Sequence, residues 1–333
     1  MDEAKFKCEL KTRQIKVDEF IWKATKVIES ETFRSAATHL IEGGKRMRPA
    51  LALFACGASG GHEDTCIPVA SAIEILNTYT LIHDDIIDKD ETRRNVPTVH
   101  TKFGIPTALL AGDVLHSMVI LTVSPIKPSQ LEYERLLDII SMLEVASLKI
   151  SEGQFYDLNL QTGQITPNEK NYIKMAEYKT AYLFQTAAEA GSLVGCGDKR
   201  ISSIFREYGH AIGIGFQIQD DILGITADES VLGKPVGSDI REGKMSLPAI
   251  HFLRNASSSQ RSKFIEIFGK NVSLKEIELI RDLFKATGSL DYAKSRAKFY
   301  AGIARAQLDK LNLDSYYRDL LETFVVFSIE RGY

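Results

Sequence analysis

Long stretches of this sequence repeat their apolar residues at the period of an α-helix, and this feature most constrains the fold. In VASAIEILNTYTLIH, apolar side chains fall at Ile73, Leu76, Tyr79 and Ile82, with more between them. Apolar residues that run nearly all round a helix are typical of a buried one. Helical patterns cover four further segments: 107–123, 133–160, 168–195 and 200–223.

Strand patterns are not convincing anywhere, because no alternating segments flank Asn-Gly or Gly-Gly turns. The breaks between helical patterns are short and marked by Gly and Pro, and no linker is rich in Ser, Pro or Gly. We therefore predict an all-α fold, with a single domain over residues 1–333.

Composition narrows the function classes. Apolar residues make up 44% and charged residues 26% of the 333 positions, and 41 Lys and Arg against 44 Asp and Glu leave a net charge of −3. A protein that binds nucleic acid usually carries a strong excess of positive charge, so we expect no nucleic-acid partner. Without 18 consecutive apolar residues we expect no membrane span, and the N-terminus resembles no signal peptide. Four scattered cysteines favour a reducing, cytoplasmic location.

The first polar cluster is LIHDDIID, at the end of the most apolar helical segment. Asp84 and Asp88 are four residues apart, so on a helix they share one face, about 5–6 Å apart at Cβ. Asp85 lies about 100° round from Asp84. A cation should compensate these charges, and Mg²⁺ fits because it binds one or two carboxylates and leaves positions for phosphate oxygens. For this motif alone, a solvated helix end stays open as an alternative.

A second aspartate pair follows another apolar helical segment, in FQIQDDILG. Gln217, Asp220, Asp221 and Gly224 stand at i, i+3, i+4 and i+7, which is one helical face. Two such motifs in one chain make a chance surface origin less probable for either.

Basic residues accompany both motifs. Carboxylates for a divalent metal together with several cations suit a polyphosphate substrate, since arginine offers a bidentate fork and lysine a point charge. No Walker loop, GxSxG or HExxH motif points to another chemistry. The basic residues are Lys45 and Arg48 in GGKRMRP, Arg93, Arg94, Lys179, Lys234 and Lys244.

These motifs resemble the trans-isoprenyl diphosphate synthases, the polyprenyl synthetase family. The resemblance runs from about residue 40 to 250 and includes GGKRMRP, LIHDDIIDKDETRR, Gly112-Asp113, Gly153-Gln154 with Asp157, Lys179-Thr180, and FQIQDDILG followed by GKPVGSDIREGKMSLP. It implies a helical bundle around a deep apolar cavity, usually a homodimer, with the aspartate motifs facing each other across the cavity mouth.

The resemblance also implies residue roles. Mg²⁺, three ions with substrate bound, would be held by Asp84, Asp88 and Asp220, assisted by Asp85 and Asp221. The allylic diphosphate would be bound by Arg93, Lys179 and Lys234, with Thr180, Gln217 and Lys244 nearby. The diphosphate of isopentenyl diphosphate would be bound by Lys45, Arg48 and Arg94. The residues expected to be catalytic are Asp84, Asp85, Asp88, Arg93, Lys179 and Asp220.

The implied reaction is ionisation, condensation and elimination. The allylic substrate (dimethylallyl, geranyl or farnesyl diphosphate) would ionise, and isopentenyl diphosphate would attack the cation and then lose a proton. Alternatives are a class I terpene cyclase, which needs no second diphosphate site, and a non-catalytic synthase subunit, which tends to lose one aspartate motif.

Two departures from the family pattern stand out. Gly224 replaces the third aspartate of the second motif. Asn77, which we expect to bind substrate by donating a hydrogen bond to a phosphate, stands where many relatives carry His or Gln. Product length in the family depends on bulk below the first motif. Tyr79 five residues before Asp84, with the smaller Thr80 beside it, resembles the archaeal type that makes geranylgeranyl diphosphate (C20). Farnesyl (C15) and longer products stay open. On an ideal helix Tyr79 lies about 140° from Asp84, so either the helix is distorted or Tyr79 wedges against a neighbouring helix.

Overall fold

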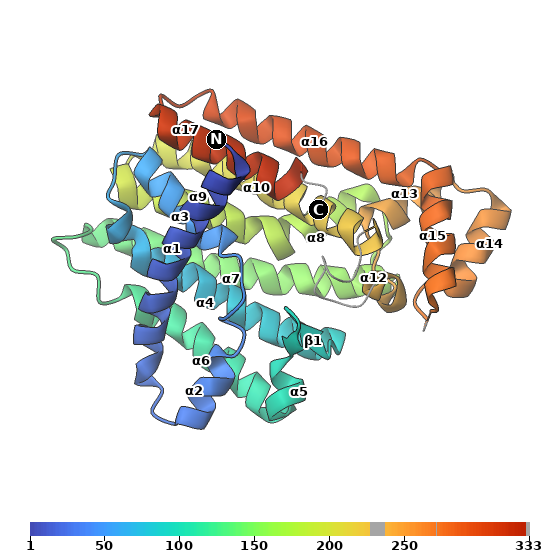
Figure 1. The fold of residues 1–333 in the computed structure, drawn as a ribbon, viewed down its shortest axis with the longest axis horizontal. Helices are drawn as coiled ribbons and strands as arrows, with labels where there is room; N and C mark the ends of the chain where they lie inside the picture. The colour runs from blue at the N-terminus through green and yellow to red at the C-terminus, as the bar shows by residue number, and fades with distance from the viewer. Residues whose placement is uncertain (227–236, 271, 331–333) are drawn as a thin grey trace. The chain divides into compact units, whose positions relative to one another are not determined.

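The computed structural model describes residues 1–226, 237–270 and 272–330, and helices account for most of them (Figure 1). The strands within these ranges are β1 (Thr92–Arg93) and β2 (Val96–Pro97), which form one antiparallel hairpin. The predicted all-α fold is therefore confirmed.

The residues group into two compact units, each discontinuous in sequence. Unit 1 comprises Met1–Leu148, Tyr182–His210 and Ala304–Phe324, and unit 2 comprises Lys149–Ala181, Ala211–Ile303 and Val325–Tyr333. Four helices contribute residues to both: α7 (Tyr133–Gln161), α10 (Lys199–Thr226), α16 (Ser289–Leu308) and α17 (Ser315–Val325). The single domain expected over residues 1–333 stays a prediction.

Unit 1 is built round α4, which packs against α3, α6 and α9. The sequence requires this, because α3 and α4 are apolar on nearly every side and most of their residues are buried. Besides the strands, unit 1 holds α1 (Glu3–Ala24), η1 (Thr25–Val27), α2 (Glu31–Thr38), α3 (Met47–Ala58), α4 (Glu63–Asp88), α5 (Val99–Phe103), α6 (Ile105–Val123) and α9 (Tyr182–Cys196).

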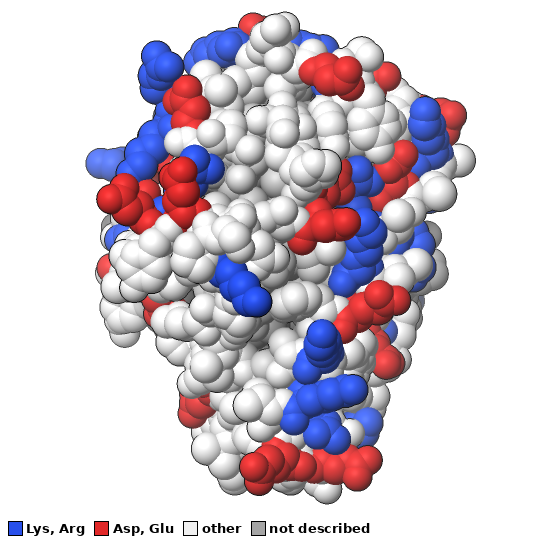
Figure 2. Space-filling view, turned by 90° about the vertical axis from the view of Figure 1, so that its left-hand side faces the viewer, with Lys and Arg blue, Asp and Glu red and all other residues white. Residues whose placement is uncertain are grey.

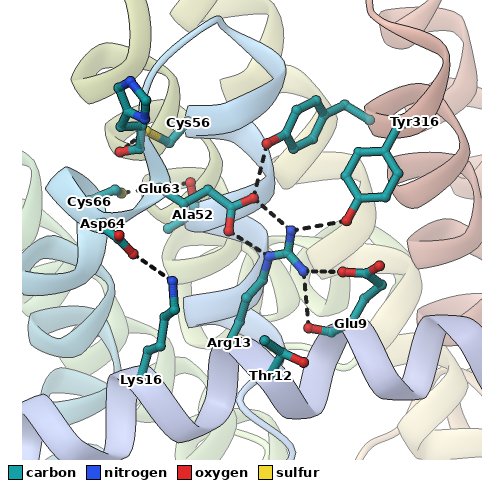
Figure 3. Close-up of polar contacts among 12 residues, drawn as sticks. Glu9, Thr12, Arg13, Lys16, Ala52, Cys56, Glu63, Asp64, Cys66 and Tyr316 are labelled. Atoms are coloured by element: carbon teal, nitrogen blue, oxygen red, sulfur yellow. Dashed lines mark hydrogen bonds and ion pairs between the residues drawn. The ribbon is translucent and has the colours of Figure 1, made fainter.

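A polar network ties the first helix of unit 1 to elements far away in sequence (Figure 3). The buried Arg13 of α1 makes bonds of 2.7 Å to both carboxylate oxygens of Glu63 on α4 and one of 2.6 Å to Glu9. From α17, Tyr316 lies 3.4 Å from the same guanidinium, and Tyr317 donates to Glu63 at 3.2 Å. Because these charges are paired with one another, burying them costs less free energy.

Unit 2 has a separate aromatic core, in which Phe252, Phe264 and Phe284 contact one another at ring distances of 4.9 to 5.8 Å. Capping boxes at Ser257 and Ser273 start two of its helices. Its elements are α8 (Glu169–Ala176), the π-helical η2 (Glu177–Ala181), α12 (Ser238–Glu242), α13 (Leu247–Asn255), α14 (Ser258–Ile267), α15 (Leu274–Ala286) and the π-helical η3 (Val326–Glu330).

Among the described residues, two helices are long and apolar enough to cross a membrane by length and composition: α4, whose most apolar stretch is 72% buried, and α6, whose most apolar stretch is 39% buried. Core helices meet the same criterion, so no clear span follows. On the face drawn in Figure 2, basic and acidic side chains lie beside one another, in keeping with the nearly balanced composition.

Candidate active site

The first aspartate motif forms the last turn of α4. The helix ends at Asp88, and the next residue, Lys89, has the left-handed conformation (φ 58°) and donates its N–H to the carbonyl of Asp85. Asp84 and Asp88 are half-buried, whereas Asp85 is completely buried. The predicted helical placement of all three aspartates is therefore observed.

The hairpin after α4 returns an arginine to this motif. Arg94 (φ 55°) and Asn95 (φ 62°) form a tight turn with two left-handed residues, which matches the twist of a two-residue hairpin. Arg93 Nε then donates to Asp85 Oδ1 at 2.5 Å, and Arg93 Nη2 to Asp90 at 3.3 Å. Burial lowers the pKa of Arg93, but the charge of Asp85 and its bond to Arg93 outweigh it, so the pKa of Arg93 is raised overall and the guanidinium stays charged.

The basic segment at the start of α3 also lies in unit 1, and its two arginines have different environments. Arg46 is 2% exposed and pairs with Asp18 at 2.6 Å and Glu74 at 3.1 Å, which makes it a structural residue. Arg48 lies 4.4 Å above the ring of Phe184, a cation–π distance. Lys45 is exposed.

Arg94, predicted to act with Lys45 and Arg48, donates from Nη1 to the carbonyl of Leu40 at 2.5 Å. Its pKa is lowered, first by burial and also by the positive charges of Arg46 and Arg93. An anion near these cations would relieve the repulsion among them.

The candidate chain-length residues lie in the interior of α4. Tyr79 is 7% exposed; its hydroxyl is 2.5 Å from Ser147 Oγ on α7, and its ring is 5.1 Å from His116 of α6. Since α4 is helical through this turn, Tyr79 wedges against neighbouring helices, the second of the two expected possibilities. Thr80 donates to the carbonyl of Asn77, which is itself buried.

In unit 2, a π-helical turn brings Lys179 against α7. A Cβ atom at Gly153 of α7 would lie 2.2 Å from the backbone nitrogen of Lys179, so this approach requires glycine. Lys179 Nζ then donates to Asp157 Oδ2 at 2.7 Å. Burial raises the pKa of Asp157, but the charges of Lys179 and Lys244 outweigh it and lower the pKa overall. π-turns are frequent at functional sites.

The second aspartate motif lies on α10 and holds its two carboxylates differently. Asp220 is exposed, whereas Asp221 is 6% exposed. Three neutral donors reach Asp221: the hydroxyl of Tyr172 at 2.7 Å, the amide of Gln217 at 2.9 Å and the backbone N–H of Leu247 at 3.2 Å.

The pKa of Asp221 follows from its burial, from the charges near it and from these donors. Burial raises its pKa to about 7, and the charges of Asp239 and Asp220 add to the effect, while the bonds from Tyr172 and Gln217 oppose it. Burial and the charge of Asp221 also raise the pKa of Tyr172, so this hydroxyl stays a donor. Thr180 completes the chain by donating to Gln217 Oε1 at 2.5 Å.

Gly224 stands where the family motif has its third aspartate, and its surroundings explain the departure. A Cβ atom at this position would lie 2.3 Å from Oδ2 of Asp239 on α12, so the carboxylate of Asp239 already occupies the space. Lys244 lies 3.7 Å from Asp239 and 2.8 Å from Glu242. The predicted Lys234 lies outside the described residues.

The donor set fits Mg²⁺. Within the described ranges, no three His, Cys, Asp or Glu side chains are gathered into a metal site of their own. Mg²⁺ does not need one, because it commonly binds one or two carboxylates and completes its shell with water and substrate phosphates. Asp84, Asp88 and Asp220, all accessible to solvent to some extent, suit that mode.

Sequence reasoning missed three contributors to the site: Tyr172, Asp239 and the N–H of Leu247. The glycine at position 224 was a usable indication that another side chain fills that space. Nothing in the local pattern indicates that Tyr172, 49 residues from Asp221, would be its partner.

Comparison with known proteins identifies the family. Residues 30–286 match the Polyprenyl synthetase family. A short chain isoprenyl diphosphate synthase of Methanothermobacter thermautotrophicus is 39% identical over 94% of this chain and 95% of that protein. For a geranylgeranyl diphosphate synthase of Methanosarcina mazei the identity is 36%, over 98% of each.

A solved structure agrees with the sequence relatives. The crystal structure of geranylgeranyl pyrophosphate synthetase from Pyrococcus horikoshii matches this fold with a TM-score of 0.92 and 35% identity, over 100% of both chains. The chain therefore belongs to the polyprenyl synthetase family of prenyltransferases, as predicted from its motifs. Members of this family are generally Mg²⁺-dependent.

Proposed function

We propose that this enzyme condenses isopentenyl diphosphate with allylic diphosphates and makes geranylgeranyl diphosphate (C20). The observation that carries the proposal is the chemistry of the two aspartate motifs, each of which has its own basic residues within the same unit. The names of the archaeal relatives support the C20 product.

Three Mg²⁺ ions would be held by Asp84, Asp88 and Asp220, with Asp85 and Asp221 behind them. When bound, they would neutralise charge on the departing diphosphate and so favour ionisation. The chain's own part is to hold these carboxylates in place. Asp85 does so through Arg93, and Asp221 does so through Tyr172.

The allylic diphosphate would bind Arg93 and Lys179, assisted by Lys244. Each of these cations is paired with a carboxylate of the chain in the structure. A diphosphate would compete with those carboxylates for the same N–H donors, and this pairing supports the proposal because it shows that each cation can bind an anionic oxygen from its present position. Lys234 is proposed for the same role on its motif alone.

Isopentenyl diphosphate would bind Lys45, Arg48 and Arg94. The double bond of isopentenyl diphosphate would then attack the allylic cation. The condensed product would lose a proton to the released diphosphate. Water must be excluded from this step, because it would quench the cation. The largely apolar interior of α4, with the aspartate motif in its last turn, would serve this purpose.

We further propose that Asp239 supplies the carboxylate that Gly224 lacks. The space of a side chain at position 224 is filled by the carboxylate of Asp239. The second motif would therefore keep a third acidic group, delivered from α12 instead of α10.

The protein would act as a homodimer through an apolar face of α6 and α7. Leu110 and Leu121 of α6 are 58% and 55% exposed, and Leu137 and Leu148 of α7 are 49% and 55% exposed. His116 and Glu144 link the two helices at 3.7 Å, so these apolar stripes belong to neighbouring helices. Exposed apolar area of this kind marks interaction sites. A cytoplasmic location stays a prediction.

Product sizing tests the function. The purified protein would be incubated with Mg²⁺, isopentenyl diphosphate and, in separate reactions, dimethylallyl, geranyl and farnesyl diphosphate, and the products measured by mass spectrometry. We expect C20 with every primer and no turnover without isopentenyl diphosphate. Turnover of an allylic diphosphate alone would indicate a cyclase, and no product with any primer would indicate a non-catalytic subunit.

The floor of the cavity is tested by Tyr79→Ala. If Tyr79 limits the chain, removal of its ring lets the product grow beyond C20 by one or more five-carbon units, which mass spectrometry would resolve. Tyr79→Phe is the matched control, since it keeps the ring and removes only the bond to Ser147. An unchanged C20 product from Tyr79→Ala would place the floor elsewhere.

A further inference from the structure

Unit 2 contains a cavity of about 580 Å³ that none of the proposed substrate or metal residues lines. It lies between the start of α8, one side of α13 and Tyr292 of α16. A cavity of this volume is within the range that binds small organic ligands.

One wall of the cavity is aromatic and firmly held. The rings of His251 and Tyr292 stack at 4.3 Å with 21° between their planes. Nδ1 of His251 is 3.0 Å from the hydroxyl of Ser289, and the hydroxyl of Tyr292 donates to Glu169 at 2.5 Å. Leu247, Ile250 and Leu253 of α13 add aliphatic surface, while most of the remaining lining residues are polar, so one side of the cavity offers an apolar surface to a ring.

The charges around the cavity favour an anion. Arg254 lines it and takes part in no ion pair within the described part of the chain. The carboxylate that also lines it, Glu169, is already satisfied by Arg296 at 3.0 Å and by Tyr292. Burial lowers the pKa of His251 and the charge of Arg254 adds to this, while the charge of Glu169 opposes it, so the neutral form of the ring is favoured overall.

The helices that enclose the cavity also hold Asp221. Tyr172 of α8 donates its hydroxyl to Asp221 Oδ2 at 2.7 Å, and Leu247, the first residue of α13, donates its N–H to the same oxygen at 3.2 Å. The two helices are in contact with each other. A molecule that fills the cavity between them therefore fixes the spacing of two donors on one carboxylate.

We propose that this cavity is a regulatory site for a small aromatic carboxylate, with its ring against His251 and Tyr292 and its anionic group on Arg254. Bound there, the ligand stabilises the arrangement of α8 and α13 that orients Asp221, and so strengthens Mg²⁺ binding at the second aspartate motif. This effect on the metal rests on the proposed function, whereas binding to the cavity does not. The coupling is reciprocal, so Mg²⁺ must tighten the ligand by the same factor.

Isothermal titration calorimetry with 2-naphthoate as the probe tests binding without any substrate or turnover. We expect one site per chain, and at least about tenfold weaker binding to Arg254→Gln, which loses the charged partner of the carboxylate. Lys263→Gln is the matched control, because it removes the same charge from an exposed position of unit 2 outside the cavity. Tyr292→Ala should weaken binding through loss of the aromatic wall. Melting temperatures would show that the variants fold.

The same titration with saturating Mg²⁺ tests the coupling. We expect Mg²⁺ to tighten 2-naphthoate by about fivefold, the low end of common coupling factors. In Tyr172→Phe, which removes one of the two donors to Asp221, this enhancement should fall towards none. No binding to the wild-type protein, or equal binding to Arg254→Gln, would overturn the site. Binding that Mg²⁺ leaves unchanged would overturn the regulatory role.

Discussion

The two aspartate motifs each bury one carboxylate, but they compensate it by different means. In unit 1, the completely buried Asp85 has a cation of the chain, Arg93, at 2.5 Å. In unit 2, Asp221 receives three neutral donors, and no ion pair within the described residues includes it. Burial accordingly raises the pKa of Asp221 to about 7.

This difference shows that one chain can hold two buried carboxylates in different electrostatic environments. The buried carboxylate of the first motif has its counter-ion within the fold, whether or not a ligand is present. The buried carboxylate of the second motif is costly to ionise until a cation arrives. We therefore expect the second motif to be the more sensitive of the two to metal removal.

The largest expected effect is on turnover, where the two motifs should behave alike. Asp84→Ala and Asp220→Ala should each lower kcat by about 10²–10³-fold, because each removes a ligand of the Mg²⁺ ions that would neutralise the leaving diphosphate. Steady-state kinetics at saturating substrates measures this. Asp64→Ala, in the first turn of the same α4, is the control, since its ion pair with Lys16 is exposed. A small effect at only one position would show that the metal is held by one motif.

Substitutions at the two motifs should change the free energy of unfolding by different amounts. Arg93→Gln should lower the free energy of unfolding by about 3–5 kcal/mol, because it leaves Asp85 buried without its cation. Asp221→Asn should cost much less at pH 7 without metal, since an amide replaces a group whose pKa is about 7. Urea denaturation with EDTA compares them. The double variant Asp85→Asn with Arg93→Gln should lose less than the sum of its single changes. Equal losses from Arg93→Gln and Asp221→Asn would remove the contrast.

The pH dependence of stability sharpens the same contrast. Asp221 binds its proton more tightly when folded than when unfolded, so it stabilises the metal-free protein below about pH 4 and loses this contribution as the pH rises towards 7. Relative to Asp221→Asn, the wild-type protein should lose at most about 4 kcal/mol over this interval. Denaturation curves at several pH values with EDTA measure it, and added Mg²⁺ should reduce the loss. A flat difference would show that Asp221 is ionised without metal.

The smallest expected effect concerns the missing third aspartate. Gly224→Asp should lower kcat about tenfold, because the new carboxylate would collide with that of Asp239 and repel it. Combining it with Asp239→Ala should recover most of the activity, since one carboxylate then again occupies the space. Steady-state kinetics of the two single variants and the double variant gives the coupling. Activity that falls further in the double variant would show that Asp239 has another role.

The helical framework could be predicted from the sequence because apolar periodicity is a local property. The pattern over 133–160 corresponds closely to α7, and the one over 200–223 to α10. The pattern over 168–195 appeared as one helix, but the structure inserts the π-helical turn η2. That turn depends on the contact between Gly153 and Lys179, which lies outside the local pattern.

The candidate site was predictable where motifs are long and uncertain where a partner is distant. The local sequence does not distinguish Arg46 from Arg48, yet Arg46 forms an ion pair with Glu74, 28 residues away. The same limit explains why Asp239 was missed: it lies on α12, whereas Gly224 lies on α10, and no local pattern relates the two helices.

The network around Arg13 has a consequence for how the protein is made. Arg13 and its tyrosine partner on α17 are separated by 303 residues. The first two segments of unit 2, Lys149–Ala181 and Ala211–Ile303, are encoded between them. At a synthesis rate of 5–20 residues per second, α1 leaves the ribosome roughly 15–60 s before Tyr316 does. Until then Arg13 has Glu9 and, once it has been made, Glu63, but not Tyr316. Unit 1 therefore begins to form early and is completed late, and a ribosome that stalls before α17 leaves a nascent chain whose first helix lacks its final partners.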